Sequence, residues 1–258
     1  MPARLLGEPA TTAGPCILDF GEWSVYKPLA HPRKEKMRPT HRLLCALVPI
    51  IAALGLFAAP TAQAQNHAGE FDHYLLALSW IPAYCAEDGD ARDDPRCEDD
   101  SAIGWAVHGL WPQHARGDWP EYCTTNERNP SRRETADQAD LFGASGAAWH
   151  QWNKHGRCTG LSSRNYYRLV RHAVDQIALP EVFEAITREF EIDPDVIEAA
   201  FIEANPGLTH DMLVTSCPGG EMVELRVCLT RDLEPRLCDA ATLRRECRYE
   251  STRLLPLR

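Results

Sequence analysis

The chain has 258 residues, of which 44% are hydrophobic and 25% charged, and its formal net charge at pH 7 is −10. This acidic balance argues against a stable nucleic-acid-binding module, because a surface that tracks phosphates should be basic. No internal repeat is visible in the sequence.

Residues 37–64 have the layout of a secretory signal peptide. A short basic stretch starts at Met37, a long apolar run covers residues 43–59, and Ala62-Gln63-Ala64 is a small-residue cleavage site. A membrane anchor is the competing interpretation. Pro49 inside the run and the absence of a stop-transfer flank favour the signal peptide.

Residues 1–36 show no periodicity and precede this signal, so we expect a dispensable leader or an over-extended start. Residues 65–258 are then expected to form one secreted or periplasmic domain without a membrane anchor, and we expect a monomer. Residues 1–64 hold seven of the 27 basic and four of the 37 acidic residues, which leaves 20 against 33 and a net charge of −13. Such a domain is long enough for a core of its own.

The first half of this domain predicts two strands, over residues 72–80 and 103–110. Between them, residues 86–100 carry eight carboxylates. A calcium site is conceivable there, but the spacing does not fit an EF-hand loop. A solvated loop bounded by Cys85 and Cys97 is the favoured interpretation.

The second of these strands leads into His108-Gly109-Leu110-Trp111-Pro112-Gln113. We expect the strand to open into a turn here, with Pro112 ending regular pairing. A histidine at that point is placed to face a cleft, although a single histidine is more often structural. Residues 112–136 are rich in Pro, Arg, Thr and Asn and predict a long irregular segment, which can carry a binding site.

Residues 149–158 hold two histidines, two tryptophans and the only lysine after residue 36. In a helix, His150, Gln151, Lys154 and His155 fall within an arc of roughly 140°, at about 100° per residue. One face then offers two groups that titrate near neutrality, a fixed cation and an amide. That set is suited to binding a phosphate and moving protons. Trp149 and Trp152 are expected to pack and seat the helix.

Three further helices are predicted downstream. The first covers residues 164–179 after the capping residues Ser162 and Ser163, the second residues 180–190, and the third begins at Asp193-Pro194. Their apolar stripes are expected in the core: Tyr167, Val170, Val174, Ile177, Val196, Ile197, Ala200 and Phe201.

Residues 222–229 alternate Val223, Leu225 and Val227 with polar residues and form the clearest predicted strand. Strands at both ends of the domain with helices between them predict an α+β domain around an antiparallel sheet.

Eight of the ten cysteines lie in the proposed domain, and an even number in an exported chain predicts four disulfides. They are Cys85, Cys97, Cys123, Cys158, Cys217, Cys228, Cys238 and Cys247. A zinc site is the competing interpretation, but this set contains no Cys-x-x-Cys pair. Eight cysteines allow 105 pairings, so the connectivity stays open on the residues alone.

Together, the two histidine segments resemble the active-site signatures of the ribonuclease T2 family, the acid, transferase-type endoribonucleases. The first segment matches over His-Gly-Leu-Trp-Pro. The second matches His-Glu-Trp-x-Lys-His-Gly-x-Cys except at Gln151, where the family has glutamate. The resemblance includes residues 76–80 with Cys85, and it extends over roughly residues 70–250.

The resemblance implies the α+β fold and cleavage of RNA through a 2′,3′-cyclic phosphate, without a metal or other cofactor. It implies that His155 is the general base, His108 the general acid and His150 a phosphate ligand, with Lys154 and Gln151 beside them. Trp111 and Gln113 match positions that hold the base. It also implies four disulfide pairs: Cys85–Cys97, Cys123–Cys158, Cys217–Cys247 and Cys228–Cys238.

The departure at Gln151 leaves two interpretations open. The chain is either an enzyme with a reduced rate, which we favour because His108, Lys154 and His155 are present, or a weakened relative with an RNA-binding or signalling role. A metallohydrolase is a third class, but the spacing of five between His150 and His155 does not fit ligands at i and i+4. Because acid protonates histidines and weakens the repulsion of RNA, we expect an acidic activity optimum.

Overall fold

The computed structural model describes residues 66–258. The expected leader and signal peptide therefore lie outside the described residues. Within residues 66–258, none of the helices combines the length and the apolar character that crossing a bilayer requires.

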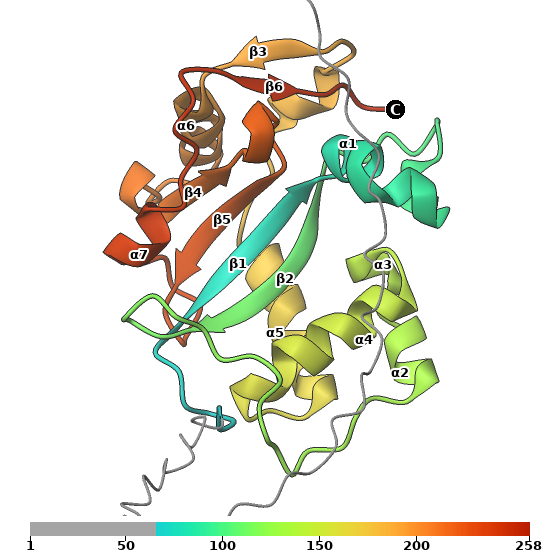
Figure 1. Ribbon diagram of the computed structural model, residues 1–258, viewed down its shortest axis with the longest axis vertical. Helices are drawn as coiled ribbons and strands as arrows, with labels where there is room; N and C mark the ends of the chain where they lie inside the picture. The colour runs from blue at the N-terminus through green and yellow to red at the C-terminus, as the bar shows by residue number, and fades with distance from the viewer. Residues whose placement is uncertain (1–65) are drawn as a thin grey trace, which may run out of the picture. The chain divides into compact units, whose positions relative to one another are not determined.

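A four-stranded antiparallel sheet forms the centre of the domain (Figure 1). Its spatial order is β2-β1-β5-β4, with β2 and β4 at the edges. The strands are β1 (His73–Trp80), β2 (Trp105–Gln113), β4 (Leu213–Ser216) and β5 (Glu224–Leu229). A separate pair joins β3 (Phe190–Ile192) to β6 (Thr252–Leu254).

Helices cover one face of this sheet, with α5 behind β1 and β2 in Figure 1 and α4 beside β2. The α+β prediction with a central antiparallel sheet is confirmed. The helices are α1 (Ile81–Tyr84), α2 (Arg132–Ala136), α3 (Ala139–Phe142), α4 (Ser145–Lys154), α5 (Ser163–Asp175), α6 (Pro194–Ala204) and α7 (Ala240–Leu243).

The two faces of the sheet carry different residues because successive side chains of a strand alternate. On the helix-covered face, one register row joins Leu76, Leu110 and Val227, all of them completely buried. The rows of the other face pair Leu75 with Trp111, Ala77 with Arg226 and Ser79 with Glu224. The polar and aromatic groups of the site therefore share the face opposite the main core.

The helix starts follow the expected capping chemistry. Ser162 accepts a hydrogen bond from the backbone N–H of Asn165 at the start of α5, and Asp193 caps α6 ahead of Pro194. Helix α5 ends at Asp175, four residues earlier than predicted. Asn205 exchanges two hydrogen bonds with the backbone of Ala178 and holds the chain outside a helical path.

The predicted helix over residues 180–190 is wrong. Only a 3-10 stretch forms, Glu181–Ala185, in which Phe183 reaches the core. Phe190 then pairs with Leu254 in the small second sheet, so the end of this segment forms a strand with residues near the end of the chain. A local pattern cannot show such a distant partner.

Several other expectations also fail at element boundaries and on exposed faces. Strand β2 continues through Pro112, which pairs with Tyr74; an edge strand tolerates proline because one side of its backbone needs no ladder partner. Trp149 is 42% exposed and Val196 53%, so neither is a core residue. The acidic segment, residues 86–100, is largely exposed as expected, but it forms helical turns over Cys85–Gly89, Asp90–Arg92 and Pro95–Cys97.

Four disulfides close the domain, and they join the pairs that the resemblance implied. Cys123–Cys158 fastens the irregular segment after β2 to the turn that follows α4. Cys85–Cys97 closes the acidic segment on itself.

Candidate active site

His108 occupies a β-bulge in β2. Gly109 pairs with Ala77 and Val107 with Leu78, so His108 is an extra residue without a partner in β1. A bulge re-aims a side chain, and here it places His108 on the same sheet face as Trp111 and away from the core. His108 therefore faces the cleft as predicted, but it does so through a bulge that the sequence pattern did not reveal.

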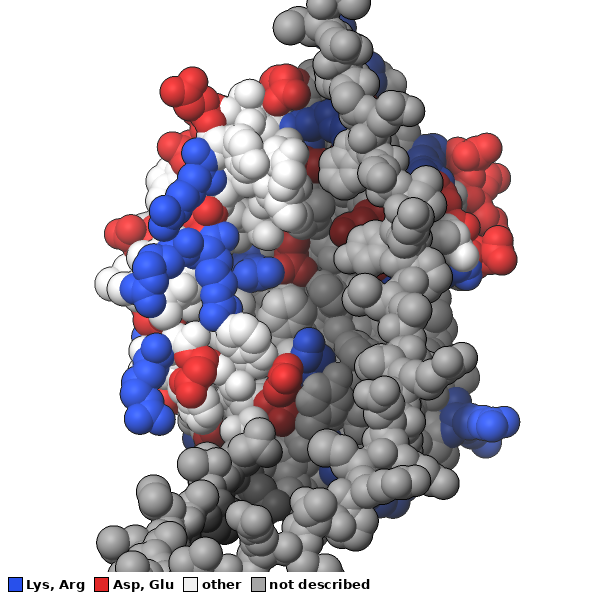
Figure 2. Space-filling view, in the orientation of Figure 1, with Lys and Arg blue, Asp and Glu red and all other residues white. Residues whose placement is uncertain are grey.

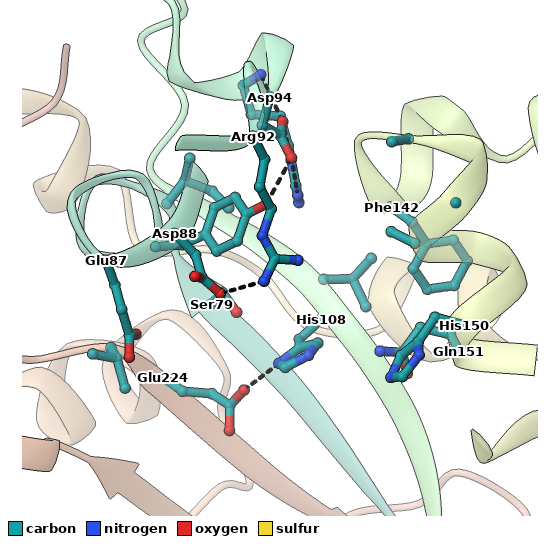
Figure 3. A pocket seen from close by; sticks show the side chains of 18 of the residues that line it. Ser79, Glu87, Asp88, Arg92, Asp94, His108, Phe142, His150, Gln151 and Glu224 are labelled. Atoms are coloured by element: carbon teal, nitrogen blue, oxygen red, sulfur yellow. Dashed lines mark hydrogen bonds and ion pairs between the residues drawn. The ribbon is translucent and has the colours of Figure 1, made fainter. Parts of the chain in front are cut away.

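The imidazole of His108 lines a cavity of about 920 Å³, and its side chain is 47% exposed. Its Nδ1 lies 2.6 Å from the Glu224 Oε2 on β5, as Figure 3 shows. Arg226 Nε donates to the other oxygen of the same carboxylate, at 2.6 Å. Glu224 is buried, yet the contacts from His108 and Arg226 outweigh its desolvation and lower its pKa. The carboxylate is therefore ionised at working pH.

Helix α4 supplies the opposite wall. His150 and Gln151 line the cavity across from His108 (Figure 3). Burial, followed by the charges of Lys154 and His108, lowers the pKa of His150. The helix predicted for this segment is confirmed, and it ends at Lys154, with His155 as the C-cap residue.

The indole of Trp111 joins the two walls. Its ring lies 5.0 Å from the His108 ring and 5.2 Å from the His155 ring, centroid to centroid, with the second pair stacked. Its Nε1 donates to the Gln151 Oε1 at 2.9 Å. Both motif histidines thus contact one aromatic side chain, although they are 47 positions apart in the sequence.

His155 is only 5% exposed and is not among the residues that line the cavity. Burial lowers its pKa to about 3, and the charges of Lys154, His108 and His150 act in the same direction. Its Nδ1 is enclosed without a hydrogen-bond partner among the described residues. Burial thus favours the neutral form of this ring, which stacks on Trp111.

Lys154 lies beside this histidine pair without lining the cavity itself. Its Nζ is 3.7 Å from the Glu121 Oε2, and its backbone carbonyl accepts from Tyr122 N–H at 2.8 Å. Tyr122 precedes Cys123, whose disulfide to Cys158 therefore anchors both sides of this contact.

Gln113, like Trp111, Lys154 and His155, is not among the residues that line the cavity. It is 4% exposed, and its amide donates to the carbonyl oxygen of Pro112 at 2.9 Å.

Sequence reasoning missed three parts of the site. Glu224 and Arg226 belong to the polar half of an alternating strand, a pattern that ordinarily indicates a solvated face. The acidic segment contributes the third part, with Arg92 and Asp94 among the lining residues. Glu224 and Arg226 could have been identified only from the strand order, which brings β5 next to β1.

Among residues 66–258, two groups of side chains are close enough to share a metal ion, and neither includes a residue of this site. The first contains Cys85 and Cys97, which are joined in a disulfide. The second is Asp195, Glu198 and Glu246.

Charge is distributed unevenly over the described surface. Figure 2 shows Lys and Arg gathered on the left of the view, where Figure 1 places α7, and Asp and Glu at the upper right, beside the segment after α1. The pKa of Arg245, just after α7, is lowered by burial and by the charge of Arg226. Because Arg226 lines the cavity, the basic side of the surface extends to the cavity wall.

Known proteins resemble this chain in sequence and in fold. The model of the ribonuclease T2 family matches residues 71–196. A ribonuclease of Aeromonas hydrophila is 39% identical over 124 residues, which cover 46% of this chain and 54% of that protein. The chain spans about half the length of the first curated relatives it matches.

Solved structures show the same fold at low identity. An RNase-related protein from Calystegia sepium aligns with a TM-score of 0.55 and 17% identity over 73% of this chain and 98% of that one. RNase NT in complex with 5′-AMP aligns with a TM-score of 0.51 and 19% identity over 73% and 100%. On its family match, its ribonuclease relatives and its fold, the chain belongs to the ribonuclease T2 family.

Proposed function

We propose that the protein is an endoribonuclease that cleaves single-stranded RNA by transesterification, without a metal, and with low base specificity. The observation that carries the proposal is the contact of His108, which lines the cavity, and of His155 with the single indole of Trp111. Two imidazoles that contact one side chain are close enough to serve one scissile linkage.

The chemistry uses the nucleophile that RNA carries. His155 takes the proton of the 2′-hydroxyl, whose oxygen then forms a bond to phosphorus. His108 protonates the departing 5′-oxygen as its bond to phosphorus breaks. The products are a 2′,3′-cyclic phosphate and a free 5′-hydroxyl, and DNA is inert because it lacks the attacking group.

The electrostatics of the two histidines support this division of labour. A base must be neutral before it acts, and burial favours the neutral His155 ring by lowering its pKa to about 3. An acid must hold a proton before it acts, and the His108 Nδ1 lies 2.6 Å from the carboxylate of Glu224. Lys154 and His150 would stabilise charge on the phosphoryl oxygens.

The substrate class follows from likeness to a solved structure. RNase NT is described in complex with 5′-AMP, and by likeness we assign a nucleotide to the cavity here. Trp111 would stack on a base without strong preference, as aromatic platforms do. We further propose that the protein is exported, acts as a monomer and performs RNA catabolism in the periplasm or outside the cell.

The alternative is a weakened relative with an RNA-binding or signalling role. The neutral Gln151 favours it, since the family's carboxylate is missing. The charge of −13 over residues 65–258 disfavours it, because stable RNA binding needs a basic surface.

One assay distinguishes these functions. The purified, oxidised protein is incubated with homopolymer RNAs in EDTA at pH 5 and at pH 7.5, and the product ends are analysed. We expect cleavage at both pH values, faster at pH 5, with 2′,3′-cyclic phosphate ends from every homopolymer. Stable binding without cleavage would support the alternative, and a need for metal would contradict the proposed chemistry.

A further inference from the structure

The contact between Glu224 and His108 has chemical consequences that depend on which atoms meet. Glu224 is a buried carboxylate on β5, in the same register row as Ser79, and it reaches across β1 to the bulge in β2. An ionised carboxylate can only accept hydrogen bonds. The 2.6 Å contact therefore requires a proton on the His108 Nδ1.

We infer that Glu224 is a positioning residue that fixes the tautomer and orientation of His108, so that His108 exchanges protons with substrate through Nε2 alone. Nδ1 keeps its proton in both the neutral and the charged ring. The nitrogen that loses a proton to the leaving oxygen is then the one that regains it. This inference rests on the proposed function for its catalytic consequence, but not for the tautomer itself.

Arg226 completes the arrangement. Its Nε donates to the Glu224 Oε1, and its guanidinium lies 5.7 Å from the centre of the Trp111 ring. The two oxygens of one carboxylate thus have separate tasks, one toward Arg226 and one toward His108. Because Arg226 can only donate hydrogen bonds, it holds one carboxylate oxygen of Glu224 and leaves the other toward His108.

Other titratable groups lie around the same ring, and among the described residues none of them hydrogen-bonds to it apart from Glu224. His150 and Lys154 lie on α4 and His155 is its C-cap residue, and the charge of His108 lowers the pKa values of both histidines. Across the cavity, the segment after α1 contributes lining residues of both signs: Glu87, Asp88, Arg92, Asp93, Asp94 and Arg96. Glu224 is the acidic group in hydrogen-bond contact with His108 among the described residues.

The variant Glu224→Gln tests this asymmetry. With Arg226 still donating, the glutamine carbonyl must face Arg226, and its NH2 group then faces His108. Nδ1 must become an acceptor, so the neutral ring changes to the Nε2–H tautomer. An acid in the wrong tautomer cannot be regenerated at the correct nitrogen, and one positioned proton transfer contributes roughly 10²–10⁴ in rate.

The first measurement is made on the unaltered protein, labelled with ¹⁵N in its histidines, at pH 9. Long-range ¹⁵N–¹H correlation spectra should show the neutral His108 ring protonated at Nδ1. A ring protonated at Nε2 overturns the inference, whether or not the protein cleaves RNA. This result needs neither activity nor a variant.

The second measurement is kinetic and uses dinucleotide substrates. Glu224→Gln should lower kcat by about 10² or more with little change in KM, and Glu224→Asp should restore part of the loss. A substrate with a 5′-sulfur leaving group, which departs without protonation, should restore most of the Glu224→Gln rate. Glu221→Gln is the matched control, because Glu221 pairs with Arg253 and not with His108.

The outcomes separate the two proposals. If the unaltered protein cleaves no RNA, the proposed function fails while the tautomer measurement still decides the role of Glu224. If the protein is active and Glu224→Gln retains kcat within about twofold, the positioning role fails and the function stands.

Discussion

At the scale of single residues, Gln151 shows how a neutral amide fits a site built around charge. Its carbonyl oxygen accepts from the Trp111 indole, and its side chain is buried on the cavity wall. The NH2 group is then the end that remains for a ligand. A glutamate there would keep the bond to Trp111 and place a second oxygen near Lys154.

Gln151→Glu should therefore raise turnover, by up to about tenfold in kcat, or about 1.4 kcal/mol of barrier. Initial rates on a homopolymer RNA at pH 5 measure the effect. Gln176→Glu, an exposed change at the C-cap of α5, is the control. An unchanged kcat would mean that position 151 has no part in the reaction, and a reduced kcat would contradict the expected direction.

His155 predicts a specific dependence of stability on pH. Its pKa is about 3 in the folded protein, below the value of 6.5 for a free imidazole, so the unfolded chain binds the additional proton between these values. The free energy of unfolding should accordingly fall on acidification through this window, by up to about 1.4 kcal/mol per pH unit from this residue. His73 and His150 contribute with the same sign, because their pKa values are also lowered.

Urea unfolding at pH 7.5 and pH 5 checks this expectation. His155→Gln should unfold with a smaller difference between the two pH values than the unaltered protein. His172→Gln, an exposed change on α5, should leave the difference unchanged. Equal pH dependence in the protein and in His155→Gln would show that this ring titrates normally.

At the scale of secondary-structure elements, the approach of α4 to β2 depends on a residue without a side chain. Gly109 lies in the bulged part of β2, directly beneath the hydrogen bond from Trp111 to Gln151. A Cβ there would overlap the Gln151 amide and the Trp111 indole nitrogen.

Gly109→Ala should break that hydrogen bond and separate the walls of the site, with a loss of kcat/KM of at least about tenfold. Gly146→Ala makes the same change inside α4, where nothing lies within 4 Å. It should increase the free energy of unfolding by about 0.5–1 kcal/mol. A fully active Gly109→Ala protein would contradict the proposed geometry.

Two disulfides of similar span allow stability to be separated from function. Cys123–Cys158 encloses 35 positions and Cys217–Cys247 encloses 30, so removing either should cost about 2–4 kcal/mol in unfolding free energy. Only the first anchors the turn beside His155 and Lys154. The Cys123→Ser, Cys158→Ser double variant should therefore lose kcat below its melting range, and the other double variant should not. Equal kinetics would contradict this anchoring role.

The sequence predicted those elements whose pattern is local. The helix over residues 149–154, the capped start of α5 and the strand at 224–229 follow from spacing alone. The helix expected at 180–190 failed because Phe190 pairs with Leu254, and the turn expected at Pro112 failed because β2 is an edge strand. The contact of Glu224 with His108 could not be predicted for the same reason, since the two residues are 116 positions apart.

At the scale of the whole molecule, an acidic protein must still bring a polyanion to its active site. Basic side chains gather on one flank, toward α7 (Figure 2), while acidic side chains of the segment after α1 are among the residues that line the cavity. Local attraction beside a net charge of −13 suits brief encounters rather than stable binding. That balance favours a scavenging nuclease over a module that retains RNA.

The central claim is that His108 and His155 act together on one scissile linkage. The most direct measurement compares kcat on a homopolymer RNA for His108→Ala, His155→Ala and the double variant, in EDTA at pH 5. We expect each single change to lower kcat by about 10² or more, and the double change to cost much less than the product of the two, as for residues that act as a unit. Retention of cleavage within about tenfold by either single variant would contradict it.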